Sequence, residues 1–91
     1  MTGYNKNELK ELMLIPGVGK SIARDLIEIG IHKVSDLQKK DPEVLYHRSN
    51  IKRGVIQDRC LLYVFRCAVY FAEAKKHNPE KLKWWYWKDK K

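Results

Sequence analysis

The sequence predicts an all-α fold, a compact bundle of about five helices formed by a single domain. Apolar residues recur at helical spacing through most of the 91 residues. No segment shows the alternation of apolar and polar residues that a half-buried β-strand requires. A run of 13 residues, 60–72, is apolar apart from Arg66, which makes it a candidate central helix that is too short to cross a bilayer.

Two helices are expected in the N-terminal third of the chain, separated by a bend. Residues 7–15 place their apolar side chains on one helical face. Pro16 ends this helix, because the residue before a proline is pushed out of the α-helical region. The second helix runs from about Lys20 to Ile29, and Gly30 closes it in the C′ position.

Three further helices and a tail are expected beyond this point. Ser35 is a good N-cap for a short helix. Asp41 caps the next helix, and Pro42 lies in its first turn, where the missing amide hydrogen costs nothing. In order, we predict a short helix from Ser35 to about Lys40, a fourth helix from Pro42 to about Asn50, a turn at 50–54, the longest helix at about 55–77, and a basic aromatic tail at 78–91 that is helical in its first turn at most.

The longest helix carries a narrow polar stripe and both cysteines. Charged residues recur every seven positions, at Arg59, Arg66 and Glu73. This spacing predicts one narrow solvent-exposed stripe on a helix that the shorter helices otherwise surround. Cys60 and Cys67 lie about 10 Å apart along such a helix, too far for a disulfide with each other. Both fall on an apolar face, so we expect them to pack in the core.

Charge favours an anionic partner. The net charge is +8, and residues 51–91 carry eleven lysines and arginines against four aspartates and glutamates. Nucleic acid is the partner that such a balance favours, although surplus lysine can also simply keep a small domain soluble. The polar N-terminus has no signal-peptide pattern, so we expect a cytoplasmic monomer that does not contact a membrane. The three histidines are scattered, and we predict no metal and no cofactor.

The segment from Gly17 to Ser21, Gly-Val-Gly-Lys-Ser, has two interpretations. It could end a nucleotide-binding P-loop, or it could form a hairpin between two helices. A P-loop needs a glycine five residues before Gly19 and a preceding β-strand. Leu14 stands at that position, and the residues before it have a helical pattern. The P-loop interpretation therefore fails.

The stretch from Leu12 to Gly30 resembles the helix-hairpin-helix family, whose hairpins bind DNA backbones without reading sequence. Val18 would point inward and anchor the bend. The bend would present free N–H groups at a helix N-terminus, where the helix dipole also favours an anion. The predicted phosphate-binding residues are Gly17, Val18, Gly19, Lys20, Ser21 and Arg24. The less favoured interpretation is that the hairpin is a structural turn or a protein-docking element.

Paired helix-hairpin-helix domains join two such units, and the layout here is similar to these (HhH)2 and SAM-like folds. The first motif would cover about 7–30, and residues 42–77 could form a degenerate second unit with the turn 50–54 as its hairpin. Lys52 and Arg53 would then be secondary nucleic-acid contacts, or simply a solvated basic turn.

The aromatic tail, Trp84 to Trp87, is interleaved with lysines. It could form a platform on which bases stack. Packing of two or three of these rings against the long helix is the favoured interpretation, because exposed tryptophans are costly in a domain this small.

Four segments together resemble the "pathogenicity locus" family of small helix-hairpin-helix proteins, also called mitomycin-resistance-like: 16–19, 41–46, 58–72 and 83–89. This resemblance implies a fold but no biochemical activity. The sequence shows no spacing typical of catalytic sets, so an enzyme is not expected. We predict a non-catalytic, sequence-independent DNA-binding protein. The alternative is a protein-interaction domain whose hairpin is purely structural.

Overall fold

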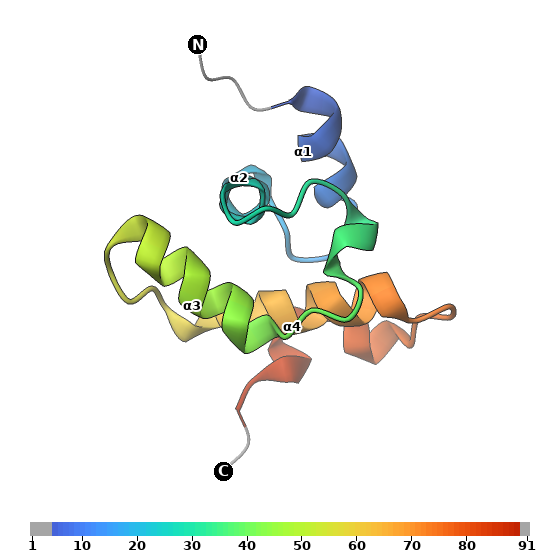
Figure 1. Cartoon of the computed structure of the whole chain (residues 1–91). Coiled ribbons are helices and arrows are strands. Elements are labelled where there is room, and N and C mark those ends of the chain that lie inside the picture. The colour runs from blue at the N-terminus through green and yellow to red at the C-terminus, as the bar shows by residue number, and fades with distance from the viewer. Residues whose placement is uncertain (1–4, 90–91) are drawn as a thin grey trace.

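One long helix, α4 (Arg59–Glu73), carries most of the packing: the helical segments 34–37, 42–53, 79–82 and 84–87 contact it, whereas the two N-terminal helices lie above it in the view and pack on each other (Figure 1). The computed structural model describes residues 5–89. Within that range all regular structure is helical and no β-strand occurs, which confirms the all-α fold. Four elements are α-helices and three are short 3₁₀ helices, where about five helices were predicted. The radius of gyration is 12.5 Å, close to the ~12 Å of a compact chain of this length.

The first helix, α1 (Lys6–Leu12), is shorter than predicted. Its N-cap is Asn5, whose side chain accepts hydrogen bonds from the first-turn amides. The helix ends at Leu12 because the chain then tightens: the amides of Leu14 and Ile15 each bond to a carbonyl three residues back. Ile15 is thereby turned into the core, where it is almost fully buried.

The second helix, α2 (Lys20–Glu28), begins where the sequence predicted and ends one residue earlier. Gly30 follows with φ +95°, the left-handed conformation expected of a C′ glycine. Ala23 and Leu26 are fully buried where α2 packs on α1. The helix–bend–helix order predicted for the N-terminal third is therefore present.

The predicted third helix is a 3₁₀ helix, η1 (Val34–Leu37), and Ser35 lies inside it instead of capping it. The Asp36 carboxylate accepts the amides of His32 and Lys33 at 3.0 and 3.2 Å, so that Asp36, not Ser35, holds the start of this turn. Leu37 is fully buried and anchors η1 against α4.

The next helix, α3 (Pro42–Arg53), is longer than predicted. Asp41 caps it as expected, with its side chain accepting the amide of Glu43 at 2.9 Å. The turn predicted at 50–54 is wrong, because residues 50–53 form the last turn of α3. Gly54 ends the helix in the left-handed conformation, with φ +72°.

Helix α4 is shorter at both ends than the predicted 55–77. Residues 55–58 form a loop that α3 holds: Tyr46 Oη donates to the Gln57 carbonyl, and the Asn50 side chain accepts the Gln57 amide at 3.0 Å. Asp58 then caps α4, accepting the Cys60 amide at 2.8 Å. The helix ends at Glu73, whose carboxylate accepts the Lys39 amide at 2.6 Å.

The tail is more ordered than predicted. It forms two 3₁₀ helices, η2 (Pro79–Leu82) and η3 (Trp84–Trp87), which fold back along α4 (Figure 1). Trp84 packs against the hydrophobic core, and Trp87 is partly buried. The predicted packing of two or three rings is therefore confirmed for these two, whereas Trp85 and Tyr86 remain 52% and 42% exposed.

Candidate nucleic-acid interface

The glycine bend, residues 13–19, joins α1 to α2 and contains the first predicted phosphate-binding residues. Gly17 has φ +86°, a backbone conformation that residues with a side chain rarely adopt. The Val18 amide donates to the Ile15 carbonyl at 3.0 Å, and this bond closes the turn. Val18 is 5% exposed and belongs to the core, so its predicted inward direction is confirmed. Its buried side chain fixes the bend while Gly17 and Gly19 stay exposed.

Several backbone amides at the start of α2 have no acceptor. Gly19 is the N-cap, and it has no side chain with which to accept a first-turn amide. The first hydrogen bond of the helix runs from the Ala23 amide to the Gly19 carbonyl at 2.9 Å. Within residues 5–89, the amides of Lys20, Ser21 and Ile22 therefore lack a protein partner. Such amides, together with the helix dipole, can bind an anionic oxygen.

Three polar side chains lie around these amides. Lys20 and Ser21 occupy the first two positions of α2, and Arg24 lies one turn further along the helix. All three are exposed. The structure thus brings together the six residues predicted to bind phosphate, with the difference that Val18 can contribute only backbone.

The two predicted secondary contacts, at the end of α3, have different surroundings. Arg53 donates through Nε to the Asp25 carboxylate at 3.2 Å, and its Nη2 forms a second bond to the same oxygen. Asp25 lies on α2 and is buried, so this ion pair joins the end of α3 to the middle of α2. Lys52 is exposed in the same turn of α3. Arg53 therefore has a structural role, the ion pair with Asp25, that the sequence did not predict.

The tail reaches the glycine bend through Trp84. A Cβ placed on Gly17 would lie 3.2 Å from Trp84 Cδ1, so the indole packs directly on the glycine. Beside this contact, a pocket of about 400 Å³ opens between the bend, the start of α4 and Trp84. The sequence predicted that the tail would pack, but no local pattern pairs residue 84 with residue 17.

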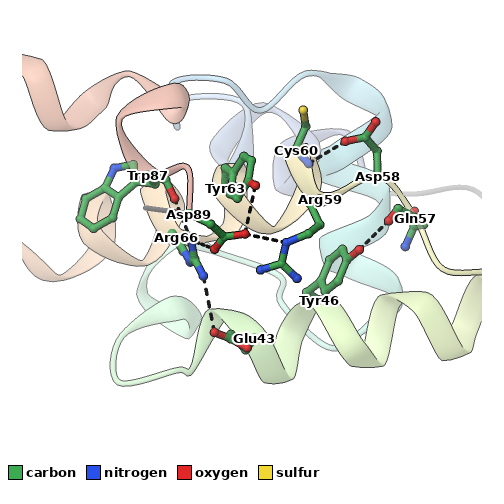
Figure 2. A network of polar contacts seen from close by, with 10 residues as sticks. All are labelled: Glu43, Tyr46, Gln57, Asp58, Arg59, Cys60, Tyr63, Arg66, Trp87 and Asp89. Atoms are coloured by element: carbon green, nitrogen blue, oxygen red, sulfur yellow. Dashed lines mark hydrogen bonds and ion pairs between the residues drawn. The ribbon is translucent and has the colours of Figure 1, made fainter. Parts of the chain in front are cut away.

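A polar network holds the tail on α4. Figure 2 shows the Asp89 carboxylate between Arg59, Arg66 and Tyr63. Arg59 Nε and Tyr63 Oη donate to Asp89 at 2.7 and 3.1 Å, and Arg66 Nη1 lies 2.9 Å from it. Arg66 also donates to the Trp87 carbonyl at 2.8 Å. Two of the three residues predicted to form a solvent-exposed stripe, Arg59 and Arg66, therefore bind the tail, whereas the third, Glu73, accepts the Lys39 amide.

This network changes the ionisation of Asp89. Burial alone would raise the pKa of the Asp89 carboxyl, but the hydrogen bonds from Arg59, Arg66 and Tyr63 outweigh it and hold the pKa below its usual value. The bond to Asp89 likewise raises the pKa of Arg59. Both groups keep their charges at neutral pH, so the ion pair that holds the tail is intact there.

The two thiols lie in different environments. Cys67 is buried, and its Sγ lies 3.6 and 3.5 Å from the Lys81 and Leu82 carbonyls. Burial raises the pKa of Cys67 to about 11. Cys60, predicted to pack in the core, is exposed at the start of α4. Its pKa is raised chiefly by a hydrogen bond to Asp58 and further by partial loss of hydration, while nearby Lys88 opposes the rise.

Residues 5–89 contain neither a candidate metal site nor a candidate membrane-spanning helix. Within them no group of three or more histidine, cysteine, aspartate or glutamate side chains could hold a metal ion. None of the helices described there has the length and apolar character needed to cross a bilayer.

Fold and bend together define a small all-helical protein in which a bend containing Pro16 and Gly17 presents the start of an exposed helix. The chain belongs to the pathogenicity locus family, Cdd1, whose profile matches residues 5–91. It is also similar to the mitomycin resistance protein McrB of Streptomyces lavendulae, with 34% identity over 87 residues that cover 96% of this chain and 76% of that protein. No solved structure matches it significantly.

Proposed function

We propose that this protein binds DNA without sequence preference and without catalysis, by holding a backbone phosphate on the glycine bend. The observation that carries the proposal is the row of unpartnered amides at Lys20, Ser21 and Ile22, behind an N-cap that has no side chain. A phosphate oxygen is an acceptor for such amides and carries the charge that the helix dipole favours. This is the geometry by which a helix-hairpin-helix motif would contact a DNA backbone.

The side chains around the bend add to the attraction. The exposed ammonium of Lys20, the hydroxyl of Ser21 and the guanidinium of Arg24 follow the amides on α2. At the far end of α3, exposed Lys52 offers a further cation, and the Asp25–Arg53 ion pair ties that end to α2. Residues 42–77 would then act as the degenerate second unit, with the loop 54–58 in place of the predicted turn and Lys52, in the last turn of α3, contacting a neighbouring phosphate. Affinity of this kind is sequence-independent and weak, with a Kd of roughly 10⁻⁴–10⁻⁶ M at physiological salt.

Salt titration tests the proposal. A fluorescent duplex should lose affinity steeply between low and moderate salt, because binding releases counterions from the phosphates. Lys20→Glu should weaken binding and lower the slope of log K against log salt by about 1. Lys40→Glu is the matched control: it makes the same charge change at an exposed lysine far from the bend in sequence. Equal losses in the two variants, or none in Lys20→Glu, would remove the bend from the mechanism.

The second candidate function is protein binding, with the bend serving only as a structural turn. Exposed aliphatic side chains at the end of α3 and in the following loop favour it: Ile51, Val55 and Ile56 are 68%, 60% and 87% exposed. An interaction of this kind would resist salt and would be lost in Ile56→Asp, whereas DNA binding through the bend would not depend on Ile56.

A further inference from the structure

We propose that the pocket beside the glycine bend binds one unpaired nucleobase of the DNA whose phosphate the bend holds. The inference rests on the proposed function and adds the substrate class: DNA with a bulged, frayed or single-stranded nucleotide. The pocket lies between three segments distant in sequence, and its lining includes Gly17, Ile22, Asp58, Cys60, Val64 and Trp84.

The size and lining of the pocket suit a base. Its volume of about 400 Å³ lies within the range of small-molecule sites. Ile22 from α2 and Val64 from α4 supply apolar walls, and Trp84 supplies an aromatic one. Bases stack on aromatic side chains regardless of their sequence, which matches binding that does not read sequence.

The pocket adjoins the proposed phosphate site, because its lining includes Gly17 of the bend and Ile22, whose amide is one of the three without a partner. Gly17 lines the pocket, and three residues further along the chain the unpartnered amides of α2 begin. The contact between Gly17 and Trp84 fixes the aromatic wall at this point, 3.2 Å from where a Cβ would stand. One nucleotide could therefore place its phosphate on the bend and its base in the pocket.

Charge decides which end of the nucleotide enters. Asp58 lines the pocket, and its carboxylate accepts the Cys60 amide at 2.8 Å. That bond lowers the pKa of Asp58, so the carboxylate is ionised at neutral pH and repels phosphate. A neutral base is not repelled, and its amino groups can donate to the pocket's acceptors. A base inside a duplex cannot enter unless it is first unpaired and unstacked, which costs free energy.

Cys60 makes the pocket testable. Figure 2 shows the side chains of Cys60 and Asp58 on the same side of the chain at the start of α4, opposite to Arg59. Cys60 is exposed whereas Cys67 is buried, so a maleimide should alkylate Cys60 alone in the folded protein. Alkylation with N-ethylmaleimide then places a bulky group in the pocket and leaves the amides of α2 untouched.

The experiment compares a short duplex with the same duplex carrying one bulged adenine. Unmodified protein should bind the bulged DNA at least about fivefold more tightly, the lower end of what stacking one base on an aromatic ring gives. Alkylation should abolish this preference and leave duplex affinity unchanged. Cys60→Ser controls for the reagent: because it has no exposed thiol to react, its preference should be the same with and without N-ethylmaleimide. Cys60→Leu, which enlarges the side chain without a label, should reduce it.

The outcomes separate this inference from the proposed function. The inference is overturned if the protein binds the bulged DNA no more tightly than the duplex, or if the preference for the bulge survives alkylation. The occupant of the pocket would then be an apolar side chain of a protein partner. If neither DNA binds at low salt, the proposed function fails first.

Discussion

Trp84 lies against Gly17, so closely that a Cβ on the glycine would stand 3.2 Å from the indole Cδ1. The tail, through Trp84, thus supports the bend near the start of the chain. Cys67 of α4 lies between them, with its Sγ 3.5 Å from the Leu82 carbonyl and 4.0 Å from the Pro16 carbonyl. The geometry of the bend therefore depends on α4 and on the tail as well as on the two helices that it joins.

Gly17→Ala should destabilise the fold by about 2–5 kcal/mol. The left-handed backbone accounts for about 1–2 kcal/mol of this, and the close approach to Trp84 adds about 1–3 kcal/mol. Gly30→Ala is the matched control, because Gly30 has φ +95° with nothing within 4 Å of its Cβ position. In chemical denaturation, Gly30→Ala should lose only the unfolding free energy that the left-handed backbone accounts for, about 1–2 kcal/mol. Equal losses in both variants would show that the Trp84 contact contributes nothing.

Arg53→Ala should cost about 1–3 kcal/mol of unfolding free energy, because it leaves the buried Asp25 carboxylate without this partner. The exposed Lys83–Glu80 pair offers a comparison, and Lys83→Ala should change stability by less than about 1 kcal/mol. In an Asp25→Asn background the effect of Arg53→Ala should shrink. An unchanged effect in this double-mutant cycle would assign the loss to packing of the arginine stem.

The docking of the tail should weaken in acid. Because the pKa of Asp89 is lower in the folded than in the unfolded chain, Asp89 stabilises the fold above its unfolded pKa of about 3.9, and this contribution is lost as pH falls through the lower folded value. Asp89→Asn should therefore be less stable than the parent at pH 7. The difference between the two should vanish progressively below about pH 4. A difference that stays constant down to pH 2 would contradict the role of the charge.

Only one of the two thiols should react in the folded protein. Cys60 is exposed, and because its pKa is raised its reaction with a thiol reagent should accelerate as pH rises above neutral. Cys67 is buried with a pKa of about 11 and should react only after unfolding. Counting labelled thiols by mass spectrometry, with and without denaturant, checks this. Two labels in native buffer would show that the tail leaves α4 readily.

Local signals predicted the bend and the helices around it well. Glycine after α2 and aspartate before α3 each act on the adjacent residues, so their effects could be read directly, whereas Pro16 marked the bend but not the end of α1, which lies at Leu12. The boundary between α3 and α4 differs from the prediction, although local residues mark it. Gly54 marks the end of α3, and Asp58 caps α4. Together these two residues indicate that 50–53 is helical and that the loop between the helices is 54–58.

Contacts between distant segments could not be predicted in this way. The pairing of Arg53 with Asp25 and of Asp89 with Arg59 depends on how helices cross, which periodicity does not determine. The same holds for Cys60: an apolar face predicts burial only where another element covers it, and the first turn of α4 is uncovered there. The pocket beside Gly17 is likewise a product of tertiary packing.

The most direct measurement is a titration of isotopically labelled protein with a short duplex, followed by amide nuclear magnetic resonance at low salt. If the bend holds phosphate, the largest shift changes will be at the amides of Gly19, Lys20, Ser21 and Ile22, and they will fade as salt is raised. Changes confined to the exposed residues 51–56, with those four amides unmoved, would contradict the account.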